Sequence, residues 1–320
     1  MVIWVALIIL GFVLLIKGAD FLVEGASNIA KKFHIPEIII GLTIVSIGTS
    51  MPELFVSITS ALDGYPDMAI GNIIGSNIAN LLLILGMSAI IKSIKFKKET
   101  RLIEIPMCLG ISLIFVLLCN MGQDITRLDA GILIALFVLF ILYTIIMAKK
   151  GNEFDREDDE PLENDKTKTS KSSIKDLIFV VLGIVLLKIG GDLTVDNAVN
   201  VAKHFNLTEK LISVTILAVG TSLPELVTSV SAAIKGKSDI AIGNILGSNI
   251  FNMLLIIGTS AMIKPIVYNT SYNLDMLFLI GATIVLSLFP IIPPKNKMSR
   301  MNGIVYVLIY VGYLITLFVK

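Results

Sequence analysis

Long apolar stretches separated by short polar loops occupy almost the whole chain. Stretches long enough to cross about 30 Å of hydrocarbon fall at 2–30, 36–62, 68–91, 103–121 and 128–148, and again at 174–202, 208–234, 240–263, 274–292 and 303–319. This pattern predicts an all-α membrane protein with ten transmembrane helices. Because several stretches contain Gly and Pro, an eight-helix chain with two re-entrant segments is the alternative.

The composition supports a membrane protein and excludes an ordinary soluble enzyme. Of the 320 residues, 55% are hydrophobic and only 16% are charged, whereas soluble domains carry about 25% charged residues. The net charge of +1 gives no reason to expect a nucleic-acid partner. The two cysteines, Cys108 and Cys119, both lie inside one apolar run, so no disulfide framework or Cys/His metal cluster can be built from them. We therefore expect neither enzymatic activity nor a cofactor.

The distribution of basic residues predicts the orientation in the membrane. Of the 26 Lys and Arg residues, 19 fall in one set of alternate loops and 5 in the other, and Lys17 and Lys188 lie within spans. Cytoplasmic loops carry the excess of Lys and Arg. We therefore expect a multi-pass protein of the cell membrane with both termini extracellular and the polar 149–173 segment cytoplasmic.

The chain contains one unit twice. GTSMPEL (48–54) recurs as GTSLPEL (220–226), and GNIIGSNIAN (71–80) recurs as GNILGSNIFN (243–252), both at an offset of 172 residues. Each copy holds five spans, an odd number, so the second copy must enter the membrane inverted. We therefore predict a first transmembrane repeat at 1–148, a disordered linker at 149–173 and a second, inverted repeat at 174–320. Inverted repeats are typical of transporters.

Polar residues follow one face of the second and third spans of each repeat. In the second span they recur at spacings of three and four, which places them on one side of a helix: Thr43, Ser46, Ser50, Glu53, Ser57 and Ser60, with counterparts Thr215, Ala218, Ser222, Glu225 and Ser229. In the third span they lie four apart: Asn72, Ser76 and Asn80, matched by Asn244, Ser248 and Asn252. Such faces line water or other polar faces within a membrane.

Glu53 and Glu225 are the strongest functional candidates. A charged residue in mid-span is costly and points to function. Each follows a proline, Pro52 or Pro224, which removes a helical hydrogen bond and lets the backbone open toward a cavity. Two carboxylates with hydroxyl, amide and carbonyl oxygens form a hard-ligand set, which suits Ca²⁺ and Na⁺ better than Zn²⁺ or Cu⁺.

Four acidic residues lie late in the first and sixth spans. Asp20 and Glu24, and likewise Asp192 and Asp196, are spaced four apart. With Lys17 and Lys188 nearby, they are expected to form interfacial ion pairs or a mobile polar seam.

The paired motifs G-T-S-x-P-E and G-N-x-x-G-S-N resemble those of the calcium/cation antiporter superfamily, and most closely its prokaryotic sodium/calcium exchanger branch. The resemblance implies a central site between spans 2, 3, 7 and 8, over which the first and sixth helices slide. Some family members carry Asp at the position of Asn252. The implied metal ligands are Glu53 and Glu225 as acids, Thr49, Ser50, Thr221, Ser222, Ser76 and Ser248 as hydroxyls or carbonyls, Ser46 and Ala218 as backbone carbonyls, and Asn80 and Asn252 as amides.

The expected function is therefore secondary antiport of Ca²⁺ against Na⁺ by alternating access, performed by a monomeric unit in the lipid bilayer. A Ca²⁺/H⁺ exchanger, in which the glutamates take the protons, is the alternative. A Ca²⁺ channel is a further alternative, and a saturable Ca²⁺ flux that requires a counter-ion would exclude it. An intramembrane hydrolase is disfavoured because the spans contain no His and no G-x-S-x-G or H-E-x-x-H motif.

Overall fold

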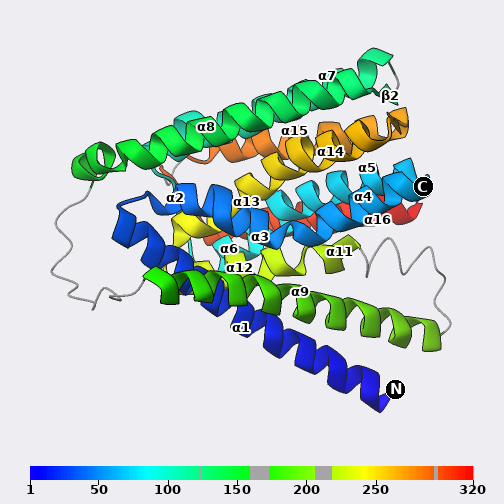
Figure 1. The fold of residues 1–320 in the computed structure, drawn as a ribbon, viewed down its shortest axis with the longest axis horizontal. Helices are drawn as coiled ribbons and strands as arrows, with labels where there is room; N and C mark the ends of the chain where they lie inside the picture. The colour runs from blue at the N-terminus through cyan, green and yellow to red at the C-terminus, as the bar shows by residue number, and fades with distance from the viewer. Residues whose placement is uncertain (123, 159–172, 206–217, 292–294, 320) are drawn as a thin grey trace.

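The computed structural model describes residues 1–122, 124–158, 173–205, 218–291 and 295–319. Helices form nearly all of the described first half (Figure 1): α1 (Val2–Phe33), α2 (Glu37–Ile40), the π-helix η1 (Gly41–Val45), α3 (Ser46–Thr49), α4 (Met51–Asp63), α5 (Pro66–Ile78), the π-helix η2 (Ala79–Ile84), α6 (Leu85–Ile91), strand β1 (Ile94–Lys95), the π-helix η3 (Thr100–Glu104), α7 (Ile105–Gly122), strand β2 (Asp124–Ile125) and α8 (Arg127–Asp158).

The described second half repeats this order of elements. It contains α9 (Ser173–His204), α11 (Ala218–Thr221), α12 (Leu223–Ile234), α13 (Ser238–Phe251), the π-helix η5 (Asn252–Ile256), α14 (Ile257–Ile263), strand β3 (Ile266–Val267), the 3₁₀-helix η6 (Thr270–Tyr272), α15 (Asn273–Leu288), strand β4 (Lys297–Met298) and α16 (Arg300–Val319).

Among the described residues, eight helices are long and apolar enough to cross a membrane. A ninth span results if the pair Glu37–Thr49 and Met51–Asp63, bent by 49°, is counted as one. The predicted span at 208–234 begins outside the described residues, which resume at Ala218. The chain is thus a multi-pass membrane protein, and the number ten remains a prediction.

The spans form an inner group and an outer group. In the apolar window of the span at Ser238–Ile263, 94% of the residues are buried, and in that of Asp67–Ile91, 78% are. The other six windows are only 22–44% buried. The two inner spans therefore form the centre of the protein, and the others present apolar side chains to lipid.

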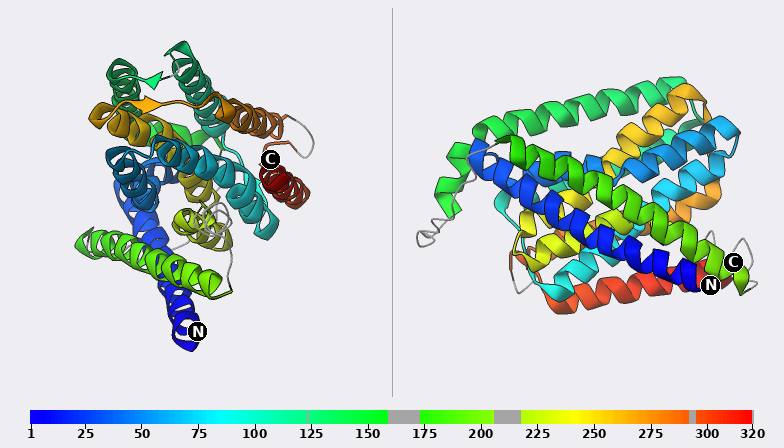
Figure 2. Two further views of the ribbon diagram at one scale, coloured as in Figure 1. Left: turned by 90° about the vertical axis from the view of Figure 1, so that its right-hand side faces the viewer. Right: turned by 60° about the horizontal axis from the view of Figure 1, so that its bottom comes forward.

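The helices α1 and α9 lie side by side and run diagonally across the other helices (Figures 1 and 2). Their backbones approach closely at glycines. A Cβ atom on Gly18 would lie 2.9 Å from the Gly183 carbonyl oxygen, and one on Gly183 would lie 2.8 Å from that of Gly18. Small residues permit such contacts between membrane helices, so α1 and α9 pack as one pair.

Two short antiparallel ladders join the two halves. Strand β1 pairs with β4, with Ile94 opposite Met298, and β2 pairs with β3, with Ile125 opposite Ile266. The span α7 separates β1 from β2, so the ladders lie at opposite ends of the molecule. Both termini lie at the β2 end, whereas α8 ends and α9 begins at the other end (Figures 1 and 2).

The segment predicted to be a disordered linker, 149–173, is helical at its two ends. Helix α8 continues through Asp158, and α9 already begins at Ser173. A helix gains a backbone hydrogen bond for each added residue, so a formed span extends easily into the adjoining polar sequence. The rest of the linker, 159–172, lies outside the described residues.

Candidate functional site

Two broken helices form the centre of the candidate site. The first break is at Ser50, between α3 and α4, where φ is −85° and ψ is 10°. The second is at Ser222, between α11 and α12, with φ −88° and ψ 9°. Pro52 and Pro224 come two residues later and lack the N–H that a continuous helix would use. The predicted break is thus present in both halves.

The two glutamates that come after these breaks lie side by side. Each is 1% exposed. The Ser50 hydroxyl donates to Oε1 of Glu225 at 2.8 Å, and the Ser222 hydroxyl donates to Oε1 of Glu53 at 3.3 Å. Each carboxylate therefore accepts a hydrogen bond from the serine that precedes the other carboxylate by three residues. These reciprocal hydrogen bonds bring the two carboxylates together where the first and second halves of the chain meet.

Helix α5 adds a further hydroxyl to this place. Ser76 donates to Oε1 of Glu53 at 3.3 Å and lies 3.1 Å from the Ser222 hydroxyl. Its counterpart on α13, Ser248, is buried, and its hydroxyl has no hydrogen-bond partner among the described residues. The two halves of the site are therefore equivalent in sequence and unequal in contacts.

The threonines before the breaks bind asparagines of the opposite half. Thr49 donates to Oδ1 of Asn244 at 3.0 Å, and Thr221 lies 3.4 Å from Oδ1 of Asn72. Each asparagine then donates to a serine of its own half, Asn244 to Ser229 at 2.9 Å and Asn72 to Ser57 at 3.2 Å. These contacts fix the broken helices against α5 and α13.

Asn80 and Asn252 contact the last residues of the two G-N-x-x-G-S-N motifs, which were not among the predicted ligands. The side-chain amide of Asn80 donates to Oδ1 of Asn249 at 3.0 Å, and that of Asn252 donates to Oδ1 of Asn77 at 2.9 Å. Asn77 and Asn249 lie just after the serines of the GSN motifs, about 100° around the helix from the polar face. Their recurrence at the offset of 172 was the available signal.

Several buried oxygens in this region have no partner among the described residues. They are Oε2 of Glu53 and of Glu225, Oδ1 of Asn80 and of Asn252, and the Ser248 hydroxyl. Unpaired buried polar atoms are rare and call for an explanation. These five atoms belong to predicted ion ligands, and together they form an oxygen-only donor set with two carboxylates. The Thr228 hydroxyl, one turn after Glu225, is also buried without a partner among the described residues. The described residues contain no group of three or more His, Cys, Asp or Glu that could hold a metal.

Two predicted backbone ligands give less information. The Ser46 carbonyl accepts hydrogen bonds from the Ser50 N–H at 3.0 Å and from the Thr49 hydroxyl at 3.3 Å. The Ser46 hydroxyl donates to the Leu42 carbonyl at 2.9 Å. Ala218 begins α11. The roles assigned to these two carbonyls remain predictions.

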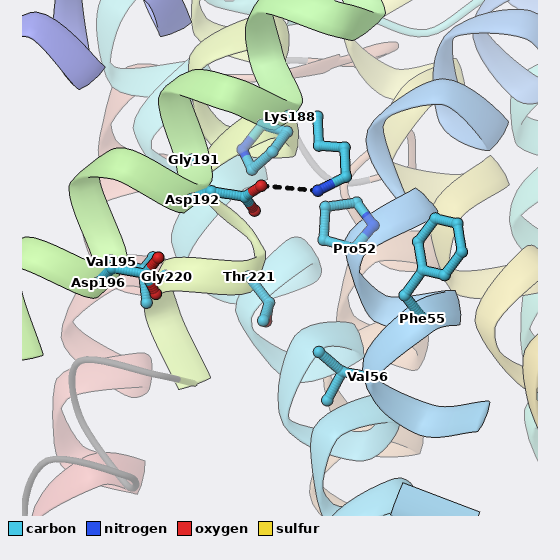
Figure 3. Close-up of a pocket in the computed structure, with 11 residues that line it drawn as sticks. Pro52, Phe55, Val56, Lys188, Gly191, Asp192, Val195, Asp196, Gly220 and Thr221 are labelled. Atoms are coloured by element: carbon cyan, nitrogen blue, oxygen red, sulfur yellow. Dashed lines mark hydrogen bonds and ion pairs between the residues drawn. The ribbon is translucent and has the colours of Figure 1, made fainter. Parts of the chain in front are cut away.

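A cavity of about 360 Å³ adjoins the broken helices (Figure 3). We call it the entrance cavity. Helix α9 supplies its charged residues, and Lys188 and Asp192 form an ion pair at 2.6 Å. Thr221 reaches it from α11, next to Ser222 of the site. The lining is completed by Pro52, Phe55, Val56, Gly191, Val195, Asp196, Gly220 and Pro224.

Comparison with known proteins identifies the family. The model of the sodium/calcium exchanger protein family matches residues 3–146 and 175–319. The chain belongs to the sodium/calcium exchanger family. Its members are transporters, so cation antiport is the activity of the family and not an enzymatic reaction. The resemblance inferred from the two motif pairs is thereby confirmed.

Relatives match the chain over most of its length. It is 32% identical to the sodium/calcium exchanger MaX1 of Methanosarcina acetivorans, over 98% of this chain and 97% of that protein. It is 36% identical to the inner membrane protein YrbG of Escherichia coli, over 85% of both. A solved structure of the sodium-calcium exchanger NCX_Mj, soaked with Na⁺ and Ca²⁺, superposes with a TM-score of 0.82 at 29% identity, covering 97% of both chains.

Proposed function

We propose that this chain exchanges Ca²⁺ for Na⁺ by alternating access at one site shared by its two halves. The observation that carries the proposal is the reciprocal bonding of Ser50 to Glu225 and of Ser222 to Glu53. It brings two buried carboxylates together, and each keeps one oxygen without a partner among the described residues. The ligands are the twelve residues predicted from the sequence, with Glu53 and Glu225 as the charged pair.

Competition for the same oxygens explains why one ion must leave before the other binds. One Ca²⁺ neutralises the two carboxylates, and Na⁺ ions must occupy overlapping oxygens to do the same. A site without cations leaves two buried charges uncompensated, which is costly. The empty protein therefore changes conformation slowly, and the two ion movements become coupled. The ions are substrates, and no cofactor takes part.

The proposal includes ten transmembrane helices in two inverted repeats, 1–148 and 174–320, joined by a cytoplasmic linker at 149–173. It is supported by the constant offset of 172 residues and by the two ladders, each of which takes one strand from each half. The excess of basic residues in one set of loops supports extracellular termini. The transport unit is a monomer, because both halves of the site come from one chain.

The main test is Na⁺-dependent ⁴⁵Ca²⁺ uptake into vesicles that contain the parent, Glu53→Gln or Glu225→Gln. Both variants should lose uptake, because every other proposed ligand is neutral and Ca²⁺ loses half of its counter-charge. Glu104→Gln is the matched control. Glu104 is a buried carboxyl away from the site, and Tyr143 donates to it at 3.1 Å. Parental uptake by Glu53→Gln or Glu225→Gln would remove that glutamate from the mechanism.

A Ca²⁺/H⁺ exchanger is the second candidate, because two protons could also neutralise two buried carboxylates. Uptake driven by a Na⁺ gradient at clamped pH separates the two functions. Asn252→Asp gives a further test, since Asn252 uses its amide group to donate to Asn77. An aspartate can donate there only as the protonated acid. Uptake by this variant should therefore depend more strongly on pH than uptake by the parent, measured from pH 6 to 9 with and without K⁺.

Orientation is tested by cysteine labelling. Asn164→Cys, in a background lacking Cys108 and Cys119, should react with an impermeant maleimide only after cells are permeabilised. Both native cysteines are buried, so their replacement removes little reactivity. Labelling of intact cells would invert the proposed topology.

A further inference from the structure

Four asparagines form a closed network where α5 and α13 enter their π-helices. All four are at most 1% exposed. The inner pair, Asn77 and Asn249, each donate to the other's backbone carbonyl, at 3.3 Å and 3.2 Å. The outer pair, Asn80 and Asn252, donate to the side-chain oxygens of the inner pair across the boundary between the halves.

The network determines which end of each outer amide is free. An amide can present either its oxygen or its NH₂ group to a neighbour. If Asn252 turned over, its oxygen would face Oδ1 of Asn77, and the two acceptors would repel. The same holds for Asn80 and Oδ1 of Asn249. The inner pair cannot turn to relieve this, because its NH₂ groups are held by backbone carbonyls.

The free oxygens belong to residues one helical turn after the serines of the site. Oδ1 of Asn80 and Oδ1 of Asn252 are buried and have no partner within the described part of the chain. They lie four residues after Ser76 and Ser248, about one turn of helix. Ser76 donates to Glu53, so this face of α5 borders the carboxylates.

We infer that Asn77 and Asn249 are positioning residues, which hold the amides of Asn252 and Asn80 with their oxygens toward the transported cation. This inference rests on the proposed function. Each inner asparagine acts on the outer asparagine of the opposite half. Groups that orient a metal ligand commonly change metal affinity about 10–100-fold when they are removed.

The test uses Asn77→Leu, which has nearly the same shape without the amide. The Ca²⁺ concentration at half-maximal uptake should rise about tenfold, while the maximal rate stays within about twofold. Asn77→Asp is the second variant. It keeps an acceptor for Asn252 and adds negative charge, so half-saturation should stay equal or fall. A residue needed only for packing would make both variants worse in the same direction.

Because Asn77 contacts Asn252 of the opposite half, double variants separate a positioning role from a purely structural one. Once Asn252 is alanine, Asn77→Leu should have little further effect on half-saturation, because its target is gone. Combined with Asn80→Ala, Asn77→Leu should still raise half-saturation, because its target Asn252 is intact. Asn120→Leu is the control. It removes an amide pair with Asn273, at 3.0 and 2.8 Å, away from the site, and should leave half-saturation unchanged.

Each result decides the inference. Unchanged half-saturation in Asn77→Leu, or effects that multiply with Asn252→Ala, would overturn it while leaving the exchange function intact. If Asn77→Leu fails to fold, Asn249→Leu tests the mirrored contact with Asn80. If neither leucine variant folds, Asn77→Asp decides, because a rise in its half-saturation would overturn the inference. A parent without Na⁺-dependent uptake would instead overturn the proposed function, a result visible before any variant is measured.

Discussion

Helices α1 and α9 occupy equivalent positions in the two halves, yet they meet the rest of the protein differently. On α1, Leu15, Ala19 and Val23 are at most 1% exposed and belong to an apolar cluster that includes Leu223 and Val227 of α12. We call this cluster the α1 seal. On α9, the counterpart of Leu15 is Leu187, which is buried in the same cluster. The counterparts of Ala19 and Val23 are Gly191 and Val195, and both line the entrance cavity (Figure 3).

The polar residues differ in the same way. Asp20 of α1 pairs with Lys235 at 2.8 Å and accepts a hydrogen bond from Ser231 at 3.0 Å. Its counterpart on α9, Asp192, pairs with Lys188 of its own helix. The equivalent segments of α1 and α9 thus differ in packing: that of α1 is buried against α12, and that of α9 lines a cavity. The difference lies in how the α1–α9 pair packs on the other helices.

The largest effect should appear in the labelling of matched cysteines. Gly191→Cys should react with a small impermeant thiol reagent on the order of a hundred times faster than Ala19→Cys, because reaction at residue 19 requires local opening of the seal. A Cβ atom at Gly191 would have only Pro224, at 3.8 Å, as a neighbour, so the cysteine fits. Equal rates would mean that both sides are open or that both are closed.

Bound ions sharpen this comparison. If the cavity leads to the site, saturating Ca²⁺ should slow the labelling of Gly191→Cys. The same variant carrying Glu53→Gln should lose this protection. If Ca²⁺ still slowed the labelling in the Glu53→Gln variant, the cavity would not lead to the proposed site.

A smaller effect is expected from wedging apart the two helices. Gly18→Ala places a methyl group 2.8 Å from the Leu187 nitrogen, so α1 and α9 must separate. We expect a loss of about 1–3 kcal/mol in the free energy of unfolding. Gly110→Ala is the control, because a Cβ atom there meets no atom within 4 Å. Denaturation in detergent measures both, and equal stability would contradict the close packing of α1 on α9.

The smallest effect should come from the ion pair beside the seal. The side chains of Lys235 and Asp20 are 34% and 37% exposed, and pairs open to solvent contribute about 0–1 kcal/mol. Lys235→Gln should therefore raise the labelling rate of Ala19→Cys by no more than about fivefold, and less at high salt. Lys188→Gln should not change that rate, because Lys188 pairs within α9. If Lys188→Gln raised the labelling rate of Ala19→Cys and Lys235→Gln did not, the ion pair within α9 would be the one that keeps the seal closed.

The span boundaries and the two carboxylates could be predicted from the sequence. An apolar run of fixed length has few alternatives in a bilayer, and a Pro-Glu pair in mid-span has both a steric and an electrostatic consequence. The predicted span at 68–91 is Asp67–Ile91 in the structure, and the one at 240–263 is Ser238–Ile263. The approach of Glu53 to Glu225 could be expected only from the repeat and the family resemblance.

Other features could not be predicted, for identifiable reasons. Asn77 and Asn249 are the last residues of the two G-N-x-x-G-S-N motifs, but they lie about 100° around the helix from the polar face, so the spacing of polar residues did not select them. Of the two outcomes predicted for the acidic residues of α1 and α9, an ion pair is present between Asp192 and Lys188, whereas Asp20 pairs with Lys235, just after α12, rather than with Lys17. The two aspartates therefore have different partners, although they occupy equivalent positions in the repeats. The partner depends on the conformation of the protein, which the repeated sequence does not predict.

The two ladders also have a consequence for how the chain is made. Strand β1 must wait for β4, about 200 residues later, which at about 5–20 residues per second takes about 10–40 s. Asn80 and Glu53 likewise wait for Asn249 and Ser222. During this time the first half resides in the bilayer with costly polar groups unpaired. A helix forms within about a microsecond, so the speed of the ribosome, rather than that of helix formation, limits assembly.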